Sequence, residues 1–342
     1  MSGAKKQKIL ALSPSASSKI PDASSAVDHW PRLSDEIVLI ILRLLPEKDL
    51  VKSSLINKRF RDLSRDKTLW TELTLDYANI KQNAESCRKL VERCKKLSSL
   101  KISNKTCQWD ILNIMTVVTR AKESLRCLEI DNALKEWSPA AMAKLGSLQN
   151  LTSLTFSMSN SNSLPVMKRV FQQLKKLKEV DIFTRDYDDS LVVALAQNNT
   201  SLKSLRLRNY PSLSDETVDV LANSCPALEG FAISSINFES AINKLSSAFP
   251  NMKCLEIDSR LTSSFKFKDE MFNKCVEAFR HLESLKVIGY TYQVTDSGIR
   301  RMVSSAENLK HLSIQQAPRV TQDLIESLRK EYPSLDLKIN FY

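Results

Sequence analysis

The sequence predicts an α/β protein in which three short helices precede a solenoid of about eleven strand-helix units with a parallel concave sheet. Two observations predict this fold. Residues Trp30 to Trp70 contain three short helical patterns, one of them apolar on nearly every side. From Trp70 onward a short apolar pattern returns about every 26 residues, and units of that size bury their apolar faces only by stacking on one another.

Residues 1–28 are rich in Ser, Ala and Lys and contain almost no bulky apolar side chains. Such a segment buries too little surface to order itself, so we predict a disordered tail. Lys5, Lys6 and Lys8 either solubilise this tail or form a weak nuclear-import patch.

The helical segment extends from residue 29 to residue 70. Ser34 or Asp35 is placed to cap the first helix, and Pro46 ends it. A second helix begins at Glu47, and a third carries Phe60. Between Ile37 and Leu45 every residue except Arg43 is apolar, a run far below the roughly 20 residues that span a bilayer. The rest of the chain cannot cover all of these side chains, so we expect a protein partner to cover some of them.

The repeat, residues 70–342, is an apolar residue followed by others three and five positions later, as in "LRCLEI" (Leu125, Leu128, Ile130). Its period lies within the leucine-rich-repeat range of roughly 20 to 29 residues. Strand alternation sends the second and third apolar residues into the core. Ser214 and Thr295 precede helical patterns and are placed to cap them. The third apolar residues are Leu75, Ile102, Ile130, Phe156, Ile182, Leu207, Ile233, Ile257, Val287, Ile314 and Ile339.

The segment from Trp30 to Trp70 closely resembles an F-box, whose pattern is Leu-Pro-x-Glu, Ile-Leu, a Leu, Asp-Leu, a basic-aromatic pair and a final Leu-Trp. It departs from that pattern at Ser34, where Pro is usual, and at Phe60, where Trp is commoner. We expect these two departures to weaken docking without abolishing it. The matching residues are Leu33, Glu36, Ile41, Leu42, Leu45, Asp49, Leu50, Arg59, Phe60, Leu69 and Trp70.

An F-box followed directly by a leucine-rich array resembles the substrate-recognition subunits of SCF ubiquitin ligases. The resemblance implies that the F-box binds the Skp adaptor, that cullin and RING subunits join through the adaptor, and that the array binds the protein to be ubiquitinated. The residues expected to contact the adaptor are Leu33, Glu36, Ile37, Ile41, Leu42, Leu45, Pro46, Leu50, Phe60, Leu69 and Trp70.

Composition argues against catalysis and against nucleic acid. Five Gly and three His leave no phosphate-binding loop, dinucleotide fingerprint, zinc motif or Ser-His-Asp arrangement, so we expect no enzyme activity, cofactor or metal. The net charge of +11 is spread along the chain without a basic block, which favours a solvated surface. Seven Cys without a Cys-x-x-Cys pair indicate a reducing compartment. With no signal peptide or membrane span, we expect the cytoplasm, the nucleus or both.

Eleven strands about 4.8 Å apart would make an inner arc of roughly 50 Å, enough for a folded partner or a long peptide. The outward strand positions alternate between acidic and basic groups, which suits a protein partner better than nucleic acid. The candidate substrate contacts there are Glu129, Asp131, Asp181, Phe183, Arg206, Arg208, Tyr210, Glu256, Asp258, Lys286 and Tyr290.

The longest interval between units, from Ile257 to Val287, contains "SRLTSSFKFKDE". We predict an insertion there, with Phe265 and Phe267 between basic residues. It either tunes binding or is simply a longer loop.

Three functions remain open at this point. The first is a substrate-recognition adaptor of a cullin-RING ligase. The second is a leucine-rich scaffold that holds the Skp adaptor without delivering a substrate. The third is a solenoid that binds nucleic acid through its excess positive charge.

Overall fold

The computed structural model describes residues 32–76, 94, 96–103, 115, 118–131, 138–158, 163–184, 188–208, 213–233, 238–258, 260 and 266–341. The chain divides into two compact units, Met1–Ser64 and Arg65–Tyr342. The tail predicted at residues 1–28 lies outside the described residues. The predicted domain boundary at residue 70 stays a prediction.

The first unit contains the three predicted helices, α1 (Asp35–Arg43), α2 (Glu47–Ser53) and α3 (Lys58–Leu63). Pro46 occupies the N-cap of α2 in an extended conformation, which both ends the preceding turn and starts the new helix. The Asn57 side chain caps α3 by accepting a hydrogen bond from the backbone N–H of Phe60 at 2.9 Å. Val38, Leu42 and Phe60 are buried.

The second unit contains an eleven-stranded sheet in which every neighbouring pair is parallel and the strands follow one another in chain order. This arrangement confirms the predicted solenoid and the predicted strand position in each unit. The strands are β1 (Glu72–Asp76), β2 (Ser99–Ser103), β3 (Cys127–Asp131), β4 (Ser153–Met158), β5 (Glu179–Thr184), β6 (Ser204–Arg208), β7 (Gly230–Ile233), β8 (Cys254–Asp258), β9 (Ser284–Ile288), β10 (His311–Ile314) and β11 (Asp336–Ile339).

The third apolar residue of each repeat lies opposite its counterpart on the next strand. Ile130 pairs with Phe156, Phe156 with Ile182, and Ile182 with Leu207. The side chains of all four are buried. The residues on either side of them point to the other face of the sheet, because side chains alternate along a strand.

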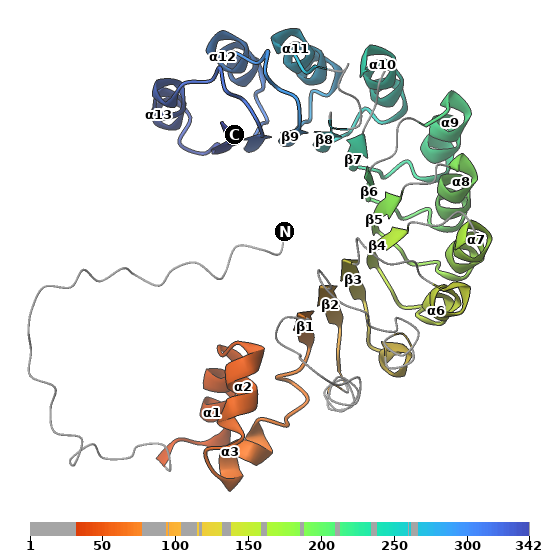
Figure 1. Ribbon diagram of the computed structural model, residues 1–342, viewed down its shortest axis with the longest axis vertical. Helices are drawn as coiled ribbons and strands as arrows, with labels where there is room; N and C mark the ends of the chain where they lie inside the picture. The colour runs from red at the N-terminus through yellow and green to blue at the C-terminus, as the bar shows by residue number, and fades with distance from the viewer. Residues whose placement is uncertain are drawn as a thin grey trace, which may run out of the picture. The chain divides into compact units, whose positions relative to one another are not determined.

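Helices cover the outer side of the sheet, and the strands line the inner side of the arc of repeats (Figure 1). The core lies between these two layers. There the Phe156 ring on β4 packs edge to face against the Phe171 ring on α7, with ring centroids 6.4 Å apart. The elements on the outer side are η3 (Thr119–Ala121), α6 (Pro139–Ala143), η4 (Lys144–Ser147), α7 (Leu164–Gln173), α8 (Asp189–Asn198), α9 (Asp215–Ser224), α10 (Phe238–Ala248), α11 (Asp269–Ala278), α12 (Asp296–Ser305) and α13 (Gln322–Glu331).

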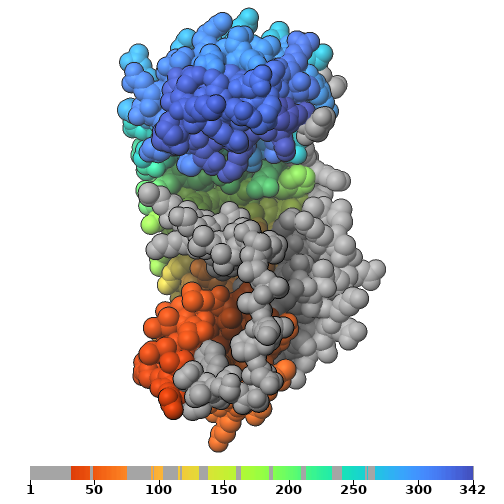
Figure 2. All heavy atoms as spheres, turned by 90° about the vertical axis from the view of Figure 1, so that its left-hand side faces the viewer, coloured from red at the N-terminus to blue at the C-terminus, as the bar shows by residue number. Residues whose placement is uncertain are grey.

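The predicted helix caps are present. Ser214 accepts a hydrogen bond from the Thr217 N–H at 3.3 Å, and Thr295 accepts one from the Gly298 N–H at 3.4 Å. The repeats then stack in chain order, so the colour changes in bands through the space-filling view (Figure 2). Each repeat therefore depends on its sequence neighbours for burial.

The insertion predicted between Ile257 and Val287 is partly core. Phe267 is 0% exposed, and its ring packs against that of Phe272 on α11 with centroids 4.8 Å apart. Phe267 is therefore a core residue of this repeat, whereas its basic neighbours Lys266 and Lys268 are exposed. Phe265 lies outside the described residues.

Candidate protein-interaction surfaces

Helix α1 carries an exposed apolar stripe. Ile37, Ile40 and Leu44 are 46%, 58% and 79% exposed, respectively. Their spacing of three and four residues puts them on one side of the helix. Val38 and Leu42 on the other side are buried. Helix α1 is therefore apolar on two faces. One face packs into the core of the first unit, and the other is exposed. We call Ile37, Ile40 and Leu44 the α1 stripe.

Three further apolar side chains of the first unit are exposed. Val51 on α2 is 42% exposed, and Leu55 and Ile56 in the turn after α2 are 78% and 64% exposed. The sequence reasoning missed all three. The available signal was two adjacent apolar residues in a turn, where solvated side chains are usual.

The residues predicted to contact the Skp adaptor fall into three groups. Glu36, Ile37 and Pro46 are exposed, and Leu33, Ile41, Leu45 and Leu69 are partly buried. Leu42, Leu50, Phe60 and Trp70 are at most 5% exposed. These last four are core residues of the chain, and their contact with the adaptor stays a prediction. Apolar character alone could not distinguish them from contact residues.

Arg59 ties the start of α1 to α3. Its Nε donates a hydrogen bond to Asp35 Oδ1 at 2.8 Å, and the guanidinium also donates to the Leu33 carbonyl. Ser34, the departure from the F-box pattern, occupies the N-cap of α1 without bonding the backbone of the helix through its hydroxyl. The pKa of the Glu36 carboxyl is lowered, chiefly because the Ser34 side chain donates a hydrogen bond to its charged form.

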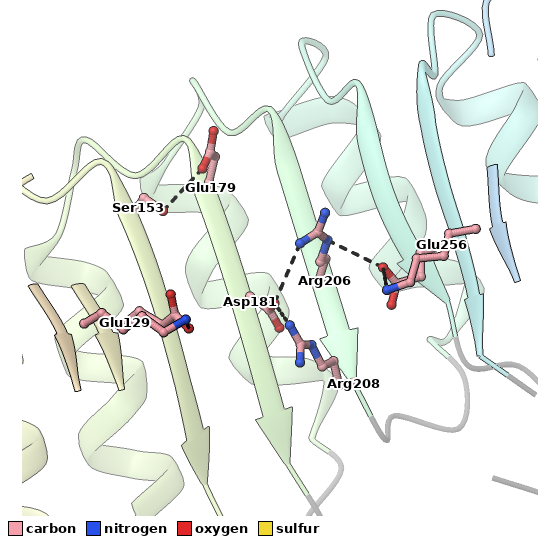
Figure 3. Close-up of polar contacts among 9 residues, drawn as sticks. Glu129, Ser153, Glu179, Asp181, Arg206, Arg208 and Glu256 are labelled. Atoms are coloured by element: carbon pink, nitrogen blue, oxygen red, sulfur yellow. Dashed lines mark hydrogen bonds and ion pairs between the residues drawn. The ribbon is translucent and has the colours of Figure 1, made fainter. Parts of the chain in front are cut away.

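On the inner face of the sheet, opposite charges on different strands pair with one another (Figure 3). Asp181 on β5 is 8% exposed and accepts a hydrogen bond from Arg208 on β6. Arg206, also on β6, lies between two carboxylates. Its Nη1 is 4.0 Å from Asp181 Oδ2, and its Nε is 3.9 Å from Glu256 Oε2 on β8. Lys286 on β9 continues the network, with its Nζ 3.3 Å from Glu256 Oε2.

The pKa of Asp181 is raised, chiefly because burial penalises the charged carboxylate. Arg208 and Arg206 act in the opposite direction and only partly compensate. The two arginine side chains are about half exposed, at 48% for Arg208 and 49% for Arg206. The inner face therefore exposes Arg206 and Arg208, whose shared partner, the Asp181 carboxylate, is buried.

The remaining charged candidates are paired locally. Glu129 on β3 pairs with Lys101 on β2, and Asp258 on β8 pairs with Arg260 at 2.6 Å. The predicted alternation of acidic and basic patches is thus a set of cross-strand and local ion pairs. These charges are neutralised within the chain, because oppositely charged residues lie directly opposite each other on adjacent strands, as Lys101 and Glu129 do.

Among the aromatic candidates, Phe183 and Tyr290 are partly buried. Tyr210 and the side chain of Asp131 lie outside the described residues. In the part of the chain that the structure describes, no group of three or more His, Cys, Asp or Glu side chains could hold a metal ion. No helix there is both long and apolar enough to cross a membrane.

Comparison with known families finds an F-box-like domain at residues 30–76. No curated protein matches the chain. Among solved structures, the chain is similar to one in the crystal structure of the yeast Rad7 and Elc1 complex, with a TM-score of 0.56 and 16% identity over 86% of this chain and 92% of that one. It is also similar to the leucine-rich repeat-containing protein LegL7 from Legionella pneumophila, with a TM-score of 0.50 and 14% identity over 78% and 89% of the two chains.

Because the sequence identity to both solved structures is low, these similarities show the fold alone. The family match covers the helices that carry the α1 stripe, and the structural matches extend over the repeats. The chain contains an F-box-like domain at residues 30–76, and its repeats have the fold of a leucine-rich-repeat solenoid.

Proposed function

We propose that this protein is the substrate-recognition adaptor of an SCF-type ubiquitin ligase. Its F-box-like domain binds the Skp adaptor, which links it to the cullin and RING subunits. Its repeats bind the protein to be ubiquitinated. In this proposal the chain has no catalytic residue, needs no cofactor, and acts in the cytoplasm, the nucleus or both.

The observation that carries the proposal is the α1 stripe within an F-box-like domain. Burying an Ile or Leu side chain is worth roughly 1.5 to 3 kcal/mol, so three uncovered side chains on one helix face favour a protein interface. Leu55 and Ile56, at 78% and 64% exposed, add further uncovered apolar surface to the same unit. We assign the adaptor contact to these residues and to Ile37, Ile40 and Leu44.

The inner face of the sheet supports the second half of the proposal. Arg206, Arg208 and Lys286 each have a carboxylate partner, so a polyanion would have to compete with Asp181 and Glu256. A folded protein can instead match both signs at once. We therefore keep Glu129, Asp181, Phe183, Arg206, Arg208, Glu256, Asp258, Lys286 and Tyr290 as candidate substrate contacts, together with Asp131 and Tyr210.

The test is coexpression of the full chain with the Skp adaptor, followed by size-exclusion chromatography. The wild-type chain should form a one-to-one complex. The double variant Ile40→Asp/Leu44→Asp should abolish it, because two charged groups would be buried in an apolar contact. Tyr292→Asp is the matched control: Tyr292 is 45% exposed and lies in the repeats, so this variant should keep the complex.

A monomeric wild-type chain, or a complex that survives Ile40→Asp/Leu44→Asp, would count against adaptor binding through the α1 stripe. Circular dichroism of both variants separates lost binding from lost folding. The substitutions lie at exposed positions, so the helical signal should be unchanged.

Delivery of a substrate is tested separately in a reconstituted ligase with a partner captured by the repeats. Ubiquitination of that partner, lost with Ile40→Asp/Leu44→Asp, supports the adaptor function. A stable ternary complex without ubiquitination would favour the scaffold alternative.

A further inference from the structure

The loops that follow β9 and β10 contain two unusual backbone conformations. Gly289 has a φ of 102°, and Gln316 has a φ of 58°, the only positive value for a non-glycine residue in the described part of the chain. L-amino acids rarely adopt the left-handed conformation, and residues held there cluster at binding and switch sites. We call residues 289–293 and 315–317 the loop site.

The conformation of Gln316 is imposed by its neighbours on both sides. The fully buried Thr291 places its hydroxyl 2.7 Å from both the Gln315 and the Gln316 carbonyl oxygens. On the other side, the Ala317 N–H donates to the Asn340 carbonyl at 3.0 Å. The turn is therefore held in one geometry before any partner arrives.

This geometry leaves a polar atom without a partner. Gln316 Oε1 is buried and makes no hydrogen bond. Among the described residues, it is the one buried side-chain nitrogen or oxygen atom without a hydrogen-bond partner. A buried acceptor without a donor is unfavourable and uncommon in folded proteins. Because this oxygen is enclosed, it is not accessible to a partner, and its cost is part of the strain held in the turn.

Two tyrosines lie beside the turn. The Tyr290 and Tyr292 rings are 6.0 Å apart between centroids and tilted by 39°. Tyr292 is 45% exposed although Thr291 between them is fully buried. Tyrosine is enriched in the centres of protein interfaces, because its ring is large and rigid and its hydroxyl can stay hydrogen-bonded.

The segment before α11 adds positive charge. The Phe267 N–H donates a hydrogen bond to the Tyr290 carbonyl at 3.0 Å. The backbones of Lys268 and Gln293 form an isolated parallel β-bridge. Phe267 is buried, whereas Lys266 and Lys268 on either side of it are exposed. Neither lysine has an ion-pair partner among the described residues. This contrasts with the inner face of the sheet, where Arg206, Arg208 and Lys286 have carboxylate partners.

We propose that the loop site, together with Lys266 and Lys268, binds an extended, acidic peptide segment, with a side chain packing on Tyr290 and Tyr292 and carboxylates facing the two lysines. The proposal rests on the proposed function only in assigning this segment to the recruited protein. An extended peptide fits because it supplies side chains at a regular spacing.

The test uses a phage-displayed library of random dodecapeptides, panned on the immobilised full chain. Enriched peptides should be rich in Asp and Glu. The enriched consensus peptide, made synthetically with a fluorescein label, should bind the wild-type chain in a fluorescence-anisotropy titration. Binding should weaken as salt rises, because the two lysines are exposed.

Three variants test whether the peptide binds at the loop site. Tyr290→Ala/Tyr292→Ala should weaken binding at least tenfold. Lys266→Glu/Lys268→Glu should do the same and should select basic peptides from the library. Gln316→Gly should also weaken binding, because glycine loosens the turn that Thr291 holds beside the two tyrosines. It should leave thermal stability unchanged or higher, since glycine accepts a positive φ and removes the unpaired oxygen. A merely structural Gln316 would instead lower stability when replaced.

Lys203→Glu is the charge control: Lys203 is exposed and directly precedes β6, which β7 and β8 separate from β9, so peptide binding should be unchanged. Failure to enrich peptides above the naive library would overturn the proposal. So would a consensus peptide that binds all three variants like the wild type. A single-stranded RNA probe that outcompetes the peptide, or a dimer that Tyr292→Ala dissolves, would assign the surface to another occupant. Adaptor binding through the α1 stripe is measured independently, so either idea can fail without the other.

Discussion

The carboxylate of Asp269 accepts two hydrogen bonds from Thr295 in the next repeat, one from the backbone N–H at 2.9 Å and one from the hydroxyl at 2.6 Å. Asp296 repeats this arrangement with Thr321, at 2.8 and 2.5 Å. Each Asp begins one helix and holds the capping residue of the next. The contacts therefore set how neighbouring repeats stack.

Asp269→Ala should lower the free energy of unfolding by about 1 to 3 kcal/mol, because hydrogen bonds to a charged group are lost and the Thr295 N–H loses its acceptor. Urea denaturation followed by circular dichroism measures the change. Asp323→Ala is the control, since Asp323 is an exposed carboxylate in the first turn of α13.

Gly298→Ala provides an independent check on the same contact. A Cβ at Gly298 would lie 2.1 Å from Asp269 Cγ, so it should displace the carboxylate. If both variants unfold like the wild type, the contact between Asp269 and Thr295 does not stabilise the stack.

Phe267→Ala should destabilise the protein by about 3 to 5 kcal/mol, the usual loss for a fully buried phenylalanine. Its ring is 0% exposed and packs against Phe272. Lys266→Ala at the adjacent exposed position should change stability by less than about 0.5 kcal/mol. Thermal melts of both variants measure the contrast, and equal melting temperatures would contradict the burial of this ring.

Asp181 should produce a specific pH dependence. Its pKa is raised by burial, so the folded state holds the proton at pH values where the unfolded chain has lost it. Stability from this group is therefore fully present below the ordinary Asp pKa of about 4 and is lost as pH rises through the raised value. Asp181→Asn should remove this component.

The measurement is the difference in unfolding free energy between the wild-type chain and Asp181→Asn across the acidic range. The difference should move in favour of Asn as pH rises. Glu179→Gln is the control, because Glu179 is an exposed carboxylate on the same strand. A difference that moves toward the wild type would mean that Arg208 outweighs the desolvation of Asp181.

The buried thiols should resist alkylation in the folded chain. Burial raises the pKa of Cys225 to about 11, and burial also raises the pKa of Cys275. Both are therefore almost entirely protonated at pH 8, and the thiolate is the reactive form. After iodoacetamide treatment, mass spectrometry should find the exposed Cys254 modified and these two unmodified. Modification of Cys225 at the rate of Cys254 would contradict its burial.

The periodic apolar residues were enough to predict the solenoid, because each strand buries the same two positions and each repeat requires a neighbour. Pro46 likewise predicted where one helix ends and the next begins, and Ser214 and Thr295 predicted two later helix starts, since capping depends on a few adjacent residues. The α1 run also predicted an uncovered face, because nine mostly apolar residues exceed what one small helical unit can bury. These properties depend on local chemistry repeated along the chain.

Tertiary structure alone decided which apolar residues of the F-box-like domain are available. Ile40 and Leu44 are exposed whereas Leu42 between them is buried, a difference set by helix packing. The same holds for charge: Asp181 and Arg208 are 27 residues apart and pair because their strands are neighbours. Gln316 carries no sequence signal at all, because its left-handed backbone and unpaired oxygen result from contacts with both adjoining repeats.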